Sequence, residues 1–187
     1  PEAAEPLAEA RYRMAQAALA AGDLETAAEL FSQAGEYRDA AQLTQKARFD
    51  YGIALSNRQE YAAAAEAFDA IPDFPEAAEE ARRARYNAAI QLLDRGENEA
   101  AIQAFSALGG YAQSADYLNK ATYQLAQADM EQKRYAQAAG LFQGLGSYLD
   151  AQERYREAQY LQALDALNAG ALAQAADIKL PEPQKTG

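Results

Sequence analysis

The chain has 187 residues, of which 50% are hydrophobic and 24% are charged, with a formal net charge of −11. This composition predicts a soluble folded protein and excludes an intrinsically disordered chain. No apolar run reaches the roughly 18 residues that a membrane-spanning helix needs, so we expect no direct membrane insertion. Nucleic acid is excluded as an expected partner, because binding its backbone requires Lys and Arg to neutralise phosphates.

The sequence contains neither cysteine nor histidine. The thiol nucleophile, the commonest general base and the commonest zinc ligands are therefore missing. Carboxylate pairs such as Glu79 and Glu80 would have to act alone, in solvent-facing stretches where catalytic pKa tuning is not expected. We therefore expect no enzyme, no metal site and no cofactor. The lack of cysteine fits a reducing and an oxidising compartment equally, so the localisation stays open.

A pattern of 37 residues recurs from Ala10 to Glu157 without insertion or deletion. An aromatic ring lies near the start of each copy, at Tyr12, Phe49, Tyr86, Tyr123 and Tyr160. A phenylalanine follows later in the copy, at Phe31, Phe68, Phe105 and Phe142. A fixed period of this size predicts stacked repeats. We divide the chain into full repeats at 10–46, 47–83, 84–120 and 121–157 and a partial repeat at 158–180.

Each repeat is predicted to contain a long first helix and a shorter second helix, because apolar residues follow helical spacing in both halves. The turn inside the repeat is predicted at Gly22, Gln59, Gly96, Lys133 and Gly170. The turn between repeats is predicted at Gly35, Pro72, Gly109 and Gly146.

The long helices are predicted over 38–58, 75–95, 112–132 and 149–169. Pro75 suits the first helical position, where its missing amide hydrogen would have no partner. The first long helix of the chain is expected to begin at Pro6, because proline is excluded from a helix interior.

The order of small and aromatic residues in each copy, such as Ala15, Gly22, Ala27 and Phe31, resembles the tetratricopeptide repeat. The period is longer than the family's usual length of about 34 residues, and the extra residues follow the short helix. The resemblance implies an all-α solenoid of about ten antiparallel helices, wound as a right-handed superhelix. It also implies that the long helices line a concave face.

Basic residues recur at two positions of the long helix. Arg11, Arg48 and Arg85 share one position, and Lys46, Arg83 and Lys120 share the position two residues earlier. In a stack they would form a basic ladder that binds an acidic peptide or a terminal carboxylate. Alternatively, they pair with glutamates, as Arg83 with Glu79, and only solvate the surface. Both interpretations stay open, and the candidate partner-binding residues are Arg11, Arg48, Arg83, Arg85, Tyr86 and Lys120.

The two ends are expected to differ from the repeats. Residues 1–9 match the end of a preceding repeat followed by the start of the first helix, and residues 181–187 are expected to form a flexible tail. We therefore expect a segment of a larger protein, either cytoplasmic or extracytoplasmic.

The expected function is that of a non-catalytic scaffold, which binds a peptide or protein partner on a surface formed by the repeats. The alternative is a structural spacer or a self-assembling segment of a larger, membrane-anchored protein. Open repeat ends favour this alternative, because they expose apolar faces that can stack end to end.

Overall fold

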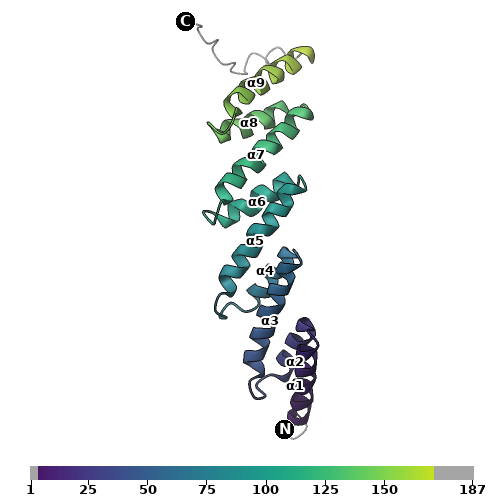
Figure 1. The fold of residues 1–187 in the computed structure, drawn as a ribbon. Coiled ribbons are helices and arrows are strands. Elements are labelled where there is room, and N and C mark those ends of the chain that lie inside the picture. Colours follow the sequence, from purple (N-terminus) through teal and green to yellow (C-terminus); the bar gives the residue numbers. More distant parts are fainter. Residues whose placement is uncertain (1–3, 171–187) are drawn as a thin grey trace. The chain divides into compact units, whose positions relative to one another are not determined.

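A computed structural model describes residues 4–170, and over this range the chain forms nine α-helices and no strand (Figure 1). The long helices are α1 (Ala4–Ala20), α3 (Ala40–Asn57), α5 (Ala77–Asp94), α7 (Ser114–Glu131) and α9 (Ala151–Asn168). The short helices are α2 (Leu24–Ala34), α4 (Tyr61–Asp69), α6 (Asn98–Leu108) and α8 (Tyr135–Leu145). The all-α repeat fold is confirmed. The rest of the fifth repeat, to residue 180, and the tail at 181–187 lie outside the described residues.

The chain divides into two compact units, Pro1–Ala88 and Ala89–Gly187, and the division falls inside α5. In the first unit, α2 packs against α1 and α3, and α3 packs against α4. In the second unit, α7 packs against α6 and α8, and α8 packs against α9. Within each unit, these helices therefore pack on the helices next to them in the sequence, as stacked repeats require.

The same small core recurs in every full repeat. A phenylalanine of the short helix is almost completely buried in each copy, at Phe31, Phe68, Phe105 and Phe142. It faces the small residue of the long helix, and in the second copy this residue is Gly52. A Cβ atom built on Gly52 would lie 2.6 Å from Cε1 of Phe68. The repeats therefore depend on small residues that let a ring approach the backbone of the neighbouring helix.

The turn inside each repeat uses one residue in the left-handed conformation, as the glycine pattern predicted. Gly22 has a φ of 79° and Gly96 has a φ of 75°. Gln59 and Lys133 occupy the same position with φ values of 62° and 59°. Their backbone is strained, because the left-handed conformation costs a residue with a Cβ atom about 1–2 kcal/mol.

The long helices begin two residues later than predicted. Arg38, Ala112 and Leu149, which we expected to be the first helical residues, have φ values between 47° and 52° and therefore break the helix. In the second copy Glu76 takes this role with a φ of 72°, because the ring of Pro75 fixes φ near −65°. The prediction that Pro75 opens a helix is therefore wrong.

Proline affects two other helix ends, and one of them, the start of α1, differs from the prediction. α1 begins at Ala4, so Pro6 lies in the first turn, where amide groups have no partner inside the helix. α4 has 9 residues, whereas α2, α6 and α8 each have 11. Pro72 explains the shorter helix, because it disfavours the helical conformation at the preceding Ile71.

Candidate functional site

The two rows of basic residues face different sides of the long helices. Positions two residues apart on a helix are separated by about 200° around its axis. In the row of Arg11, the side chains reach toward the short helices. Arg11 Nη1 donates to the carbonyl oxygen of Gln33 in α2 at 3.1 Å, and Arg85 forms an ion pair with Asp69 in α4. These contacts occupy two of the three arginines in this row.

In the other row, Lys46 and Arg83 each form an ion pair within their own helix. Lys46 Nζ lies 2.9 Å from Asp50 Oδ2, four residues further along α3. Arg83 pairs with Glu80, not with the Glu79 that the spacing suggested. Such exposed pairs contribute about 0–1 kcal/mol to stability each. The structure therefore brings Arg11, Arg48 and Arg85 toward the short helices and directs Arg83 elsewhere, so the two rows do not share one face.

The remaining candidates also have neighbours. Tyr86 is half-buried and interacts with other described residues. Lys120 belongs to the second unit, where its ammonium nitrogen lies 6.0 Å from the ring centroid of Tyr117 on the same helix. The distance is at the outer limit of a cation–π contact.

Arg48 differs from the other candidates, because it makes no hydrogen bond or ion pair with any residue between 4 and 170. Its half-buried side chain lines a groove of about 420 Å³, which we call the α2–α4 groove because those short helices form its walls. The base comes from α3. The lining residues are Glu25, Ala28, Glu29, Arg48, Tyr51, Leu55, Ala63, Glu66, Ala67 and Ala70.

The α2–α4 groove is acidic. Glu25, Glu29 and Glu66 line it, and Arg48 is its only cationic lining residue within the described range. Burial raises the pKa of Tyr51, and the neighbouring Glu25 carboxylate raises it further. A second hollow shares Arg48 with the groove and also contains acidic residues of the inter-repeat turns. The recurring cations did not indicate this groove, because its shape depends on the alanines and its charge on the glutamates of the short helices.

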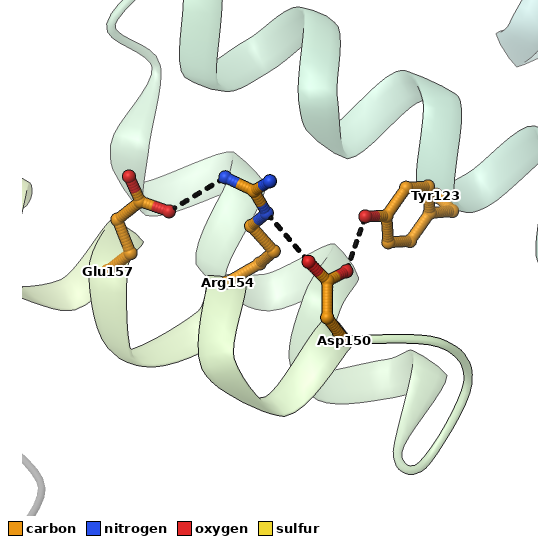
Figure 2. A network of polar contacts seen from close by, with 4 residues as sticks. All are labelled: Tyr123, Asp150, Arg154 and Glu157. Atoms are coloured by element: carbon orange, nitrogen blue, oxygen red, sulfur yellow. Dashed lines mark hydrogen bonds and ion pairs between the residues drawn. The ribbon is translucent and has the colours of Figure 1, made fainter.

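A tyrosine and an aspartate connect successive long helices in both units. Tyr123 of α7 donates to Asp150 Oδ1 at 2.5 Å, at the start of α9 (Figure 2). Arg154 donates from Nε to Asp150 Oδ2 at 3.1 Å and from Nη1 to Glu157 Oε2 at 3.0 Å. In the first unit, Tyr12 donates to Asp39 Oδ1 at 2.6 Å. We call this hydrogen bond the tyrosine–aspartate clamp.

The clamp changes the acid–base behaviour of its members. The Tyr123 hydrogen bond, followed by the charge of Arg154, holds the pKa of Asp150 below its usual value. The same hydrogen bond raises the pKa of Tyr123. Because the folded-state pKa of Asp150 is lowered, its contribution to stability is present above the usual aspartate pKa of about 4 and is lost as the pH falls through the folded-state value.

An ion pair between a buried carboxylate and an exposed arginine lies at the turn between α7 and α8. The Asp129 side chain is buried, and Arg134 Nε donates to its Oδ1 at 2.8 Å. The corresponding position of the second copy is Leu55, which is also buried. This pair and the clamp hold helices together. No group of His, Cys, Asp and Glu in the described range is arranged to hold a metal ion.

None of the described helices is long and apolar enough to cross a membrane. Comparison with models of known protein families gives no match, and comparison with curated proteins gives none. The likeness to tetratricopeptide repeats therefore rests on the residue pattern of this chain alone.

Proposed function

We propose that the chain is a non-catalytic interaction module, which binds a protein or peptide on the surface of its repeats. One observation carries the proposal. Arg48 places a half-buried guanidinium without a partner among residues 4–170 in a groove of about 420 Å³. That volume lies within the range of ligand-binding pockets, and an arginine with unused donors favours an external acceptor.

The repeat architecture supports the same function. Each helix packs on its neighbours in sequence, so the sides of the units stay open to a partner. The tetratricopeptide-like pattern supports a binding role as well, since repeat arrays of this kind present extended binding surfaces. The buried Asp129 carboxylate is used in a contact with Arg134 at the start of α8, which is a structural role.

A peptide-display selection on the immobilised chain tests this proposal. We expect at least one family of related peptides to be enriched, with affinities in the micromolar range, about −8 kcal/mol. The double substitution Arg48→Glu and Arg85→Glu should change the affinity of the enriched peptides. Arg83→Glu is the matched control, because its side chain pairs along α5 on another side. A selection that enriches no peptide contradicts the proposed function. Peptides that bind the double variant with unchanged affinity contradict the placement of the binding site near Arg48.

A second function, self-assembly through the first helix, is favoured by one exposed face. Leu7 is 50% exposed and Met14 is 58% exposed, and Ala10 between them is also exposed. The positions equivalent to Ala10 are at most 2% exposed: Ala47, Ala84, Ala121 and Ala158. For example, Ala47 belongs to α3, and α3 packs against α2, the short helix that precedes it. We propose that a second copy of the chain covers this face of α1.

Sedimentation velocity over a concentration series tests the self-assembly. The wild-type chain should form larger species as the concentration rises, and Leu7→Lys with Met14→Lys should remain monomeric. Leu149→Lys is the control, because this residue is 70% exposed but lies far along the chain at the turn before α9. A wild-type chain that stays monomeric, or a control that also prevents association, contradicts the assignment to this face.

A further inference from the structure

The α2–α4 groove is open because its walls carry alanine. Two repeats later in the sequence, Ile102 and Leu141 occupy the positions of Ala28 and Ala67, and both are half-buried. The repeat therefore accepts larger side chains at these positions. In the first unit their volume is missing, and the groove is present there. Ala28 and Ala67 therefore leave space in the groove that larger side chains occupy at the equivalent positions of the later repeats.

The charge of the groove favours a basic occupant. Glu25, Glu29 and Glu66 line the groove itself. The adjoining hollow, which shares Arg48 and Ala70 with it, adds Glu36 and Asp73. Five carboxylates therefore surround one guanidinium, giving a local negative potential that attracts cations and repels acidic ligands. This argues against the acidic peptide that the basic rows alone suggested.

Arg48 supplies the complementary donors. Arg11, at the same repeat position in α1, donates to the main-chain carbonyl of Gln33. Arg48 has no such partner among the residues that the structure describes, and its side chain lines both hollows. A guanidinium in this situation suits the main-chain carbonyl oxygens of a bound peptide, which carry no net charge and do not oppose the glutamates.

We propose that the α2–α4 groove binds a basic peptide segment of a partner protein. Lysine or arginine side chains of the segment pair with Glu29 and Glu66, and its main-chain carbonyl oxygens accept hydrogen bonds from Arg48. Small side chains of the segment pack against Ala28 and Ala67. This inference rests on the proposed interaction function and names the class of partner and its location.

The test uses the peptides enriched by display on the full chain, synthesised with a fluorescent label and measured by anisotropy at physiological salt. We expect them to be rich in Lys and Arg. Ala28→Ile with Ala67→Leu, which copies Ile102 and Leu141, should fill the groove and weaken binding at least about tenfold, or about 1.4 kcal/mol. Glu29→Gln with Glu66→Gln should weaken binding by about three- to tenfold.

A matched control separates a local effect from a general loss of charge. Glu99→Gln with Glu131→Gln removes the same charge from exposed sites in the second unit and should leave the affinity unchanged. Circular dichroism and thermal unfolding establish that each variant is folded. Acidic or uncharged peptides, or basic peptides that bind the filled groove with unchanged affinity, would overturn this inference and leave the interaction function standing. Enrichment of no peptide at all would overturn both.

Discussion

Replacing Ser114 by alanine should stabilise the protein. Ser114 is the first residue of α7 and is 0% exposed, and its hydroxyl has no hydrogen-bond partner in the part of the chain that the structure describes. The other repeats place Ala40, Ala77 and Ala151 at this position, each also 0% exposed. A methyl group therefore fits this position, so Ser114→Ala removes the unpaired polar atom and leaves the packing unchanged.

The magnitude follows from the cost of the buried hydroxyl. An unsatisfied buried polar group costs about 1–3 kcal/mol, so we expect Ser114→Ala to raise the free energy of unfolding by about 1–2 kcal/mol. For a chain of this size, each kcal/mol corresponds to a shift of about 2–4 °C in Tm. The reverse change, Ala151→Ser, introduces the same hydroxyl in α9 and should destabilise the protein by a similar amount.

Urea unfolding and amide hydrogen exchange together measure the effect. Exchange is needed because repeat proteins unfold in parts, so a global midpoint can hide a change confined to one helix. We expect slower exchange in α7 for Ser114→Ala and faster exchange in α9 for Ala151→Ser. A Ser114→Ala protein that is no more stable than the wild type would show that the hydroxyl is satisfied, and the reasoning from the repeat position would fail.

Three further changes test the other polar and strained sites. Tyr123→Phe should raise the pKa of Asp150 toward its usual value, which carboxyl NMR titration measures; an unchanged titration midpoint would contradict the clamp. Arg134→Ala should lower the free energy of unfolding by about 2 kcal/mol, because it leaves the Asp129 carboxylate buried without its partner. Urea unfolding measures this change, and a stability equal to that of the wild type would show that water replaces the arginine. Lys133→Gly should stabilise the turn before α8 by about 0.5–1 kcal/mol, because glycine adopts a φ of 59° without strain; a lower thermal midpoint would argue against that strain.

The repeat fold could be predicted because it depends on features that a sequence displays directly. The 37-residue period, the buried phenylalanines such as Phe105 and the turn glycines such as Gly96 are all visible in the residue order. The starts of the long helices could not be predicted. Ala112 and Leu149 are good helix formers, so their helix propensity does not indicate the left-handed conformation that they adopt in the turn.

The candidate site was predicted less well than the fold. Helical geometry alone separates Arg48 from Lys46 by about 200°, so the division of the basic rows into two faces could have been derived from the sequence. The clamp also had a signal, since Tyr12 and Asp39 recur together as Tyr123 and Asp150. The α2–α4 groove depends on missing side-chain volume between helices, and no residue pattern within one repeat reveals it.

The second repeat connects its long helices without a clamp. Phe49 replaces the tyrosine and has no hydroxyl, and its ring lies 4.8 Å from that of Phe74 between centroids. Protonation cannot loosen a contact between two hydrocarbon rings, whereas it neutralises the carboxylate that Tyr123 holds at the start of α9. Acid should therefore weaken the junction held by Tyr123 and Asp150 and leave the contact between Phe49 and Phe74 unchanged. Repeats of equal length can thus differ in their sensitivity to pH, because one carries a tyrosine hydroxyl where the other carries a phenylalanine ring.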